Sequence, residues 1–507
     1  MKKLLSLLLV ISVFAGCFSL SASAVKNGDV VFAGFETPIL YDSNTNHKEN
    51  AKNVLSGYVS LSELRTVMLD GISNCRAVID ISKFSIPYNE TNCYAISDYV
   101  WYALPEAFNA YQMGFSYYEG SNMLAQVSIL YRDFADTAAE YNTCMNAITA
   151  AGNEILSGIE GNSNIGCVEK ALLIHDRLAL WNEYDYSTVT PDESFTAYGA
   201  LGKQVSVCQG YAMAYMYLLG RVGIDSYYCS SVEMNHGWNI VYINNKTYHV
   251  DVTWDDYAWE DGARGAVGTV MHDNFLRSTS GIKSTGHDAS DFDDTPSDTT
   301  YDNGVWQNSI AAFQVVGNKL YYVDNANSKL MCYSDGKTLC SLEKEWWADA
   351  GSYYGNYSCL SSDGKSLYYS MTKSIYKYDL TTGTSKAIYT PTLKNYYNIY
   401  SFTYNNGYLV CDINNAPPYA SDADPTANLY QLKQKYVDTP AAKPTTGDIN
   451  GDGDITTMDL GVLMQYLNNW EITVDTNIAD VNGDGDVDTR DYGLLMQYVN
   501  GWGVTIR

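Results

Sequence analysis

Two twelve-residue segments near the C-terminus constrain this chain more than any other feature. Residues 448–459 (DINGDGDITTMD) carry oxygen-bearing side chains at positions 1, 3, 5, 7, 9 and 12, with glycine at position 6. The same pattern returns 32 residues later, at 480–491 (DVNGDGDVDTRD). A hard cation such as Ca²⁺ needs such a ring of oxygens, and the glycine permits the sharp turn within it. Two copies in register therefore predict two Ca²⁺ sites.

The predicted ligands lie at equivalent positions of the two loops. They are Asp448, Asn450, Asp452, Asp454 and Asp459 in the first loop, and Asp480, Asn482, Asp484, Asp486 and Asp491 in the second. The alternative is an acidic, solvated turn without metal. It is disfavoured because uncompensated carboxylates at this density would repel one another.

Each loop is followed by a matching helical segment, 463–468 (LMQYLN) and 495–500 (LMQYVN). Position 12 is Asp where EF-hands usually have Glu, and each loop leads into one helix. The duplicated loop and helix resemble a type I dockerin from Gly447 to about Gly501. The resemblance implies Ca²⁺-dependent docking onto a cohesin module of a scaffoldin, as in cellulosome-type assemblies. It implies cohesin contacts at loop positions 10 and 11, which here are Thr457, Met458, Thr489 and Arg490.

The composition is that of an acidic globular protein. The chain has 507 residues, enough for three or four domains. Asp plus Glu (58) exceed Lys plus Arg (31), which gives a net charge of -27, while 46% of residues are apolar. Phosphate binding needs clustered cations, and the sequence has no Lys/Arg run, so we expect no nucleic-acid partner. No segment after the N-terminus has the roughly 18 to 20 apolar residues of a membrane span.

The first 24 residues have the pattern of a secretory signal peptide. Lys2 and Lys3 precede an apolar run from Leu4 to Phe14, and a small-residue cleavage site follows at 22–24 (ASA). The alternative is cleavage before Cys17 at a lipobox-like FAGC, which would give a lipoprotein. We expect a secreted protein, on a cellulosome-type complex or the cell surface. Eleven cysteines without framework spacing predict no disulfide scaffold.

Three separate segments carry the residues of a cysteine enzyme: 205–212 (VSVCQGYA), 235–239 (NHGWN) and 248–256 (YHVDVTWDD). Cys208 precedes a predicted helix, whose positive end would lower the pKa of the thiol. A two-residue turn at 244–245 (NN) would pair Trp238 with Asp251 and His236 with Thr253. His236 and Asp251 would then be diagonal neighbours on one face of the sheet. The carboxylate would hold the imidazole as the base that a thiol needs.

Other interpretations of these residues stay open. Cys208 could be a small buried hydrophobic residue, or one ligand of a Cys/His/Asp metal site, although Zn²⁺ sites usually have more Cys and His at tight spacing. By strand parity, His249 lies on the opposite face from His236 and is expected to be structural. His175 lies in a predicted helix, where a core or capping role is expected.

The three segments resemble the transglutaminase-like superfamily of cysteine enzymes. The order Cys208, His236, Asp251 matches, as do the Cys-x-Gly-Tyr-Ala and Asp-x-Thr-Trp-Asp-Asp surroundings, over about residues 169–256. The resemblance implies a papain-like core without a catalytic cofactor. It also implies acyl transfer through a thioester: Cys208 attacks an amide carbonyl, His236 moves the proton and Asp251 orients His236. The backbone N–H of Cys208 and the side chain of Gln204 are candidate oxyanion donors.

Between this core and the tail, the sequence becomes Tyr-rich, and apolar and polar residues alternate as is typical of strands. Segments 317–322 (GNKLYY), 364–369 (GKSLYY) and 407–410 (GYLV) recur with their leucines 47 and 42 residues apart. This spacing is near one four-stranded propeller blade, but three blades are fewer than a closed propeller has. We predict a partial propeller or an irregular β module that acts as a spacer or binding surface.

The expected fold class is a multidomain α+β protein: a papain/transglutaminase-like core, an all-β propeller-like repeat module and a small α-helical calcium-binding dockerin. The expected boundaries are a signal peptide (1–24), an N-terminal α+β leader region (25–166), the catalytic domain (167–302), the β module (303–434), a Pro/Thr linker (435–446) and the dockerin (447–507).

Three functions are compatible with these features. The first is a secreted cysteine hydrolase or peptidase that acts on a protein or glycoprotein amide. The second is a protein cross-linking transglutaminase, in which an amine replaces water as the acceptor. The third is a non-catalytic adhesion or binding protein with a vestigial triad. No carboxylate pair with a motif around it supports a glycosidase.

We predict that chelation of Ca²⁺ abolishes both the helical signal of the C-terminal tail and its binding to cohesin. The loops supply carboxylates that need the cation before the tail can fold. Circular dichroism and a cohesin binding assay, each with and without EDTA, measure the two effects. Unchanged binding in excess EDTA would contradict the prediction.

Overall fold

The computed structural model describes residues 30–36, 46–259, 265–293, 295–348, 351–417, 426, 428–436, 445–451, 454–470 and 472–507. The predicted signal peptide with Cys17, most of the predicted linker, and Asp452 lie outside these residues. The chain forms two compact units, one ending at Gln434 and the other beginning at Lys435. In the described residues no helix is both long enough and apolar enough to cross a bilayer.

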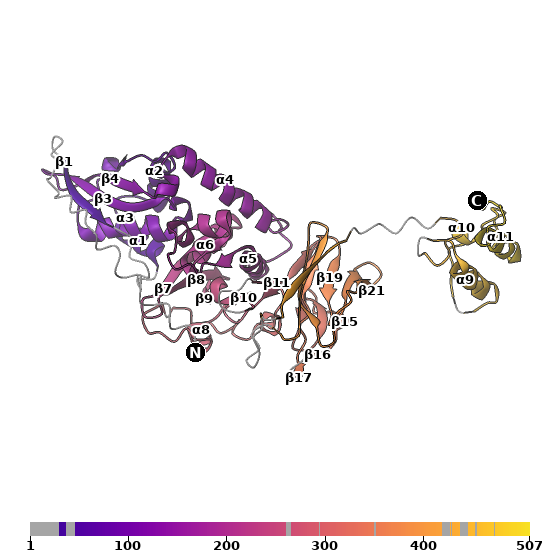
Figure 1. Ribbon diagram of the computed structural model, residues 1–507. Helices are drawn as coiled ribbons and strands as arrows, with labels where there is room; N and C mark the ends of the chain where they lie inside the picture. The colour runs from indigo at the N-terminus through magenta and orange to yellow at the C-terminus, as the bar shows by residue number, and fades with distance from the viewer. Residues whose placement is uncertain are drawn as a thin grey trace. The chain divides into compact units, whose positions relative to one another are not determined.

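The N-terminal part of the first unit is a mixed layer of helices and one antiparallel sheet (Figure 1). Its strands follow the order β1-β3-β4-β2. Side chains fix where its helices begin: Ser60 and Glu63 form a reciprocal capping box at α2, and Thr137 and Glu140 form another at α4. The elements are β1 (Val30–Glu36), α1 (His47–Leu55), α2 (Leu61–Ser73), β2 (Val78–Asp80), α3 (Glu90–Ala103), β3 (Ala110–Tyr118), β4 (Leu124–Tyr131) and α4 (Ala138–Ile155).

The next part packs one buried helix against a three-stranded antiparallel sheet, β7-β8-β9, and a second buried helix against the first. Its elements are α5 (Cys167–Trp181), β5 (Glu183–Tyr184), β6 (Val205–Ser206), α6 (Cys208–Arg221), β7 (Ser226–Ser231), β8 (His236–Ile243), β9 (Lys246–Val250), α7 (Val252–Asp255), β10 (Asp256–Ala258), β11 (Gly265–Val270) and α8 (Thr279–Ser284). Short helices η1 (Ser82–Phe84), η2 (Pro105–Ala107), η3 (Asp133–Ala135), η4 (Asp192–Phe195), η5 (Gly199–Lys203) and η6 (Val305–Asn308) connect these elements. Helix α6 packs on α5 and on strand β8.

The β8-β9 hairpin has its turn at Asn244 and Asn245, both at positive φ (52° and 63°). Its register pairs Ile243 with Lys246 and Asn239 with Val250, as the Asn-Asn turn predicts. Strand β9 ends at Val250, however, because Asp251 caps helix α7. The prediction that Thr253 faces His236 across the sheet is therefore wrong, since Thr253 lies inside α7.

One hydrophobic core extends through the first unit. Its buried members include Met68 and Ile96 near the N-terminus, Leu172 and Leu218 in the two central helices, and Phe313 at the start of the β module. The leader region and the predicted catalytic region thus share their interior. Side chains from all three regions are removed from water together, which is the dominant stabilising contribution to such a unit.

The β module consists of separate antiparallel sheets. Their orders are β12-β13-β14-β15, β16-β17, β18-β19-β20-β21 and β22-β23-β24. The strands are β12 (Gln314–Val316), β13 (Lys319–Asp324), β14 (Lys329–Cys332), β15 (Thr338–Ser341), β16 (Glu345–Ala348), β17 (Gly351–Tyr354), β18 (Leu360–Ser362), β19 (Leu367–Ser370), β20 (Ile375–Asp379), β21 (Thr384–Tyr389), β22 (Asn398–Asn405), β23 (Tyr408–Asn414) and β24 (Tyr430–Lys435). The residues described here do not close into a propeller.

The three recurring segments lead into β13, β19 and β23, which are each the second strand of their sheet. Gly317, Gly364 and Gly407 occupy the preceding turns at positive φ (61°, 81° and 79°). Glycine recurs there because residues with a Cβ rarely adopt that backbone conformation. The repeat in the sequence is thus a repeat of the hairpin between the first two strands in three of the described sheets, while the β16-β17 sheet lacks it.

The second unit contains α9 (Thr457–Leu467), α10 (Thr476–Ala479) and α11 (Thr489–Val499). Thr456 and Asp488 cap α9 and α11, so both helices begin inside the loop pattern, at its tenth position. A small core holds the unit together, with Leu460, Leu463, Ala479, Val481 and Leu495 buried in it.

Helix α6 needs a glycine at one position and not at another. A Cβ on Gly210 would lie 2.5 Å from the carbonyl oxygen of Ser194, whereas one on Gly220 would meet no atom within 4 Å. We predict that Gly210→Ala lowers the free energy of unfolding by about 1–3 kcal/mol through overpacking. The matched variant Gly220→Ala should stabilise the protein by about 0.5–1 kcal/mol. Urea unfolding followed by circular dichroism measures both, and equal stabilities would contradict the prediction.

Candidate active site and calcium-binding loops

Cys208 is the first residue of helix α6 and is buried, with 2% of its surface exposed. The N–H of Val207 donates to the carbonyl of Ser194 at 3.0 Å, which fixes the chain just before the helix. Close approach at Gly210 then allows the first turn of α6 to pack on Ser194 and Ser206. The Cys-x-Gly sequence thus places a thiol at the positive end of a buried helix.

His236 is the first residue of strand β8, after the turn from β7. The carboxylate of Asp291 holds this turn by accepting hydrogen bonds from the N–H groups of Val232 (2.8 Å) and Glu233 (3.1 Å). The imidazole stacks on the indoles of Trp238 and Trp254, with ring centroids 5.5 and 5.2 Å away. These contacts restrict the imidazole to one orientation.

Asp251 accepts four hydrogen bonds in the interior. Its Oδ1 receives the N–H groups of Thr253 (3.0 Å) and Trp254 (3.3 Å), which caps α7. Its Oδ2 receives Nε2 of His236 at 2.7 Å and Nε2 of His287 at 3.0 Å. Burial alone would raise the pKa of Asp251, but the two histidines outweigh burial and hold this pKa well below its usual range.

The other side of the His236 imidazole faces Cys208, whose side chain is its hydrogen-bond partner. Burial alone would lower the pKa of His236. Asp251 and Cys208 outweigh it, and together they raise the pKa of His236 to about 10. The structure therefore brings together the three residues Cys208, His236 and Asp251 as a chain of side-chain contacts. Such an arrangement can keep an imidazolium beside a thiolate.

His287 is a member of the site that the sequence reasoning missed. It lies on the segment after α8, is fully buried, and packs on Trp254 with ring centroids 4.0 Å apart. Burial lowers the pKa of His287, so the imidazole is neutral and donates its Nε2–H to Asp251. The surrounding sequence (STGHDAS) contains no motif that would have revealed it.

His249, Gln204 and the remaining cysteines do not join the contacts between Cys208, His236 and Asp251. His249 pairs with Ile240 across the hairpin, so it lies on the same face of the sheet as Trp238 and His236, and the prediction of the opposite face is wrong. It is buried there, and its Nδ1 accepts the indole N–H of Trp238 at 3.0 Å. Gln204 is exposed and ends η5 in the left-handed conformation. None of the ten cysteines from Cys75 to Cys411 forms a disulfide, and burial raises the pKa of Cys229, Cys359 and Cys411.

The two calcium loops close around their last aspartates. Asp459 and Asp491 are fully buried, and each accepts loop N–H groups: from Asn450 (3.0 Å) in the first loop and Asn482 (3.1 Å) in the second. Asp480 accepts the N–H of Gly483 at 2.7 Å. Converging carboxylates are the donor set that Ca²⁺ requires, so these residues fit the cation. In the second loop, Arg490 and Arg507 pair with Asp484 and Asp480.

The predicted cohesin contacts lie on the surface of the second unit. Thr457, Met458, Thr489 and Arg490 are all exposed, at the start of α9 and α11. Arg490 forms ion pairs with Asp484 (2.8 Å) and Asp488 (2.7 Å) in its own loop. Met458, at the equivalent position of the first loop, is an exposed apolar side chain.

Comparison with known proteins identifies the tail. Residues 446–500 match the model of the dockerin type I domain, so the chain carries such a domain at its C-terminus. Type I dockerins bind Ca²⁺ and dock onto cohesins in cellulosome-type assemblies.

The rest of the chain has weaker matches. One solved structure, titled "Crystal structure of a TGase", is 11% identical and has a TM-score of 0.21. The match covers 28% of this chain and 44% of that one, less than half its length. A TM-score this low does not establish a shared fold. The comparison with curated proteins found no match.

The electrostatics predict opposite protonation states for two buried histidines of the site. His236 should stay protonated well above pH 6.5, because Asp251 and Cys208 raise its pKa to about 10, whereas burial lowers the pKa of His249 to about 3. Asp251→Asn should shift the pKa of His236 downward, because the neutral amide no longer favours the imidazolium. Titration of ¹⁵N-labelled histidine by NMR, with His236→Gln for assignment, measures these values. An unchanged His236 pKa in Asp251→Asn would contradict the prediction.

Proposed function

We propose that this chain is a secreted, dockerin-borne, transglutaminase-like cysteine hydrolase or peptidase that acts on amide bonds. One observation carries the proposal: the imidazole of His236 contacts Cys208 on one side and is bound by Asp251 at 2.7 Å on the other. A thiol, an imidazole and a carboxylate in series form the catalytic unit of cysteine acyl-transfer enzymes.

The reaction follows from the roles of these three side chains. The thiolate of Cys208 attacks the amide carbonyl carbon, and His236 gives its proton to the departing amine as the C–N bond breaks. Water then attacks the thioester, His236 takes one of its protons, and the carboxylic acid leaves as the Cys208 thiolate and the His236 imidazolium are restored. Asp251 keeps His236 in one orientation throughout. The backbone N–H of Cys208, at the start of α6, is our candidate for the oxyanion donor.

The remaining parts take supporting roles in this proposal. The core adopts a papain-like, transglutaminase-like arrangement, with Cys208 on a helix that packs against the strand of His236. Two Ca²⁺ ions fold the dockerin, and Thr457, Met458, Thr489 and Arg490 contact a cohesin of a scaffoldin. The N-terminal signal directs secretion. The β module, with its propeller-like repeats, holds or presents the protein or glycoprotein substrate.

A non-catalytic binding protein is the second candidate, and the burial of Cys208 favours it. Only 2% of the surface of Cys208 is exposed, so a substrate reaches the sulfur only if neighbouring side chains move. If they do not move, the three residues are a structural cluster. In that case the chain is an adhesion or binding protein that the dockerin anchors.

Alkylation by iodoacetamide near neutral pH separates the two candidates. We predict that Cys208 reacts at least about 10-fold faster than the exposed Cys167, because its thiolate is stabilised by His236. His236→Ala should remove this excess reactivity and leave Cys167 unchanged. Peptide mapping by mass spectrometry measures both rates in one sample. Equal or slower alkylation of Cys208 would favour the binding protein.

Incubation with labelled casein, with and without a primary amine, then distinguishes hydrolysis from cross-linking. Release of short peptides or of ammonia without amine incorporation supports the hydrolase. Amine incorporation supports a cross-linking transglutaminase, and Cys208→Ser is the control that should abolish either product.

A further inference from the structure

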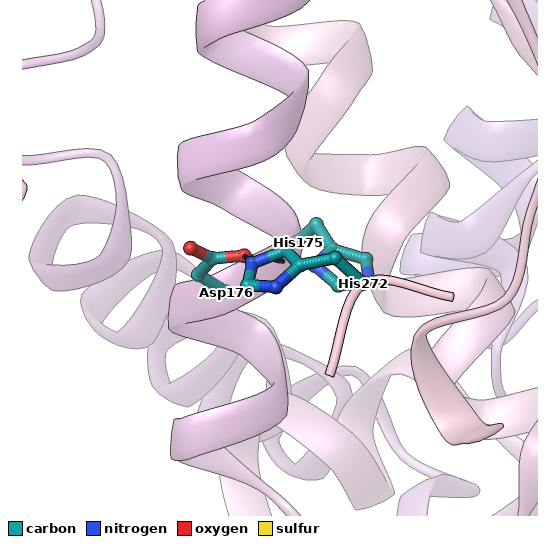
Figure 2. A group of neighbouring side chains, drawn as sticks. All are labelled: His175, Asp176 and His272. Carbon is teal, nitrogen blue, oxygen red and sulfur yellow. Dashed lines mark hydrogen bonds and ion pairs between the residues drawn. The ribbon is translucent and has the colours of Figure 1, made fainter. Parts of the chain in front are cut away.

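A second cluster of histidine and aspartate lies apart from Cys208. His175 and Asp176 come from helix α5, and His272 comes from the segment after β11 (Figure 2). All three side chains are buried, with at most 1% of any of them exposed. Three atoms, one from each side chain, lie within 4.8 Å of one another. We propose that His175, Asp176 and His272 bind one divalent transition-metal ion, with Zn²⁺ as the first expectation.

In this cluster, two imidazole nitrogens without a proton face a carboxylate oxygen, so acceptors face an acceptor. Nε2 of His175 faces the carboxylate of Asp255 at 3.2 Å, and Nδ1 of His272 faces the carbonyl of Ser309 at 2.9 Å. Each of these contacts uses the one N–H of a neutral imidazole. The remaining lone pairs, on Nδ1 of His175 and Nε2 of His272, both point at Oδ1 of Asp176, at 2.9 and 3.1 Å. Three electron-rich atoms thus converge on one place.

A cation at this place satisfies all three atoms. Each imidazole then binds the metal through one nitrogen and donates its other N–H to an oxygen. This is the usual arrangement around metal-ligating histidines, which donate to a carboxylate or a backbone carbonyl. Here Asp255 is the carboxylate and Ser309 provides the carbonyl. The second oxygen of Asp176 accepts the N–H of Phe313 at 2.7 Å, which orients the first toward the imidazoles.

The alternative without metal requires an extra proton on each imidazole. Two imidazolium ions and two carboxylates would then lie together in the closed interior, which costs much desolvation free energy. The cluster around Asp251 has a different set of hydrogen-bond donors and acceptors. There His287 donates one N–H to Asp251 and its Nδ1 has no acceptor, so a neutral imidazole is sufficient. In the Asp251 cluster only His236 carries an extra proton, beside Cys208, whereas the His175–Asp176–His272 cluster would need two.

The donor atoms select the class of metal. Imidazole nitrogens suit Zn²⁺ and its first-row neighbours, whereas Ca²⁺ takes oxygen ligands. The site therefore does not compete with the dockerin loops for Ca²⁺. Its complete burial further predicts that chelators reach the metal only when the chain unfolds.

Metal analysis of the full-length protein tests the proposal. The chain is unfolded in guanidine with a chelator and refolded with excess Ca²⁺ and equimolar Zn²⁺, and its metal content is measured after gel filtration. We expect about one Zn²⁺ per chain, resistant to EDTA in the native state. His175→Gln and His272→Gln should each lose it. His249→Gln is the matched control, because His249 is also buried and hydrogen-bonded but lies outside the cluster. Asp255→Asn should weaken Zn²⁺ binding by about 10- to 100-fold, as the loss of an outer hydrogen-bond partner does.

X-ray absorption at the zinc edge keeps the proposal falsifiable if the histidine variants do not fold. The wild-type spectrum should show two imidazole ligands. Refolded wild-type protein without bound Zn²⁺ or Co²⁺ would overturn the proposal in favour of the doubly protonated network. So would Zn²⁺ that remains bound in the His175 and His272 variants. Neither result depends on Cys208, so the outcome is independent of the proposed acyl-transfer activity.

Discussion

The carboxylate of Asp251 is the point on which the organisation of the candidate site depends. It accepts two backbone N–H groups of α7 through one oxygen and two imidazoles through the other. Strand β8, helix α7 and the segment that carries His287 therefore meet at a single buried anion. A buried charge of this kind is stable only when every nearby donor reaches it. The same requirement fixes the chain on both sides of His236 and determines which of its nitrogens faces Cys208.

The second unit follows the same principle with a different partner. Asp459 and Asp491 are as deeply buried as Asp251, but the N–H groups of their loops and the helix caps are their main protein partners. Metal binding there supplies the positive charge that imidazoles supply in the first unit. We therefore expect folding of the dockerin to depend on an ion from the medium, whereas the site around Cys208 is assembled by its own side chains.

Short sequence patterns predicted the structural features that neighbouring residues determine. The register of the β8-β9 hairpin follows from Asn244 and Asn245, and the loop residues of the dockerin follow from a fixed spacing. The end of β9 was missed because the side chain of Asp251 caps α7, which alternation along a strand does not reveal. His287 could not be found because it reaches Asp251 through a loop without periodicity. Likewise, the recurring segments predicted strands in the β module and lie at the first hairpin of three sheets, but pairing of the outer strands depends on packing between distant residues.

The short stretch from Ser309 to Phe313 joins the central helices to the β module. It runs beside β11, supplies its first carbonyl to His272 and its last N–H to Asp176, and buries the ring of Phe313 in the common core. The domain boundary predicted at residue 302 would therefore remove the hydrogen-bond partners of His272 and Asp176. Recombinant fragments meant to retain the thiol site should extend beyond Phe313, and ones that stop earlier would expose a polar, half-satisfied interior prone to aggregation.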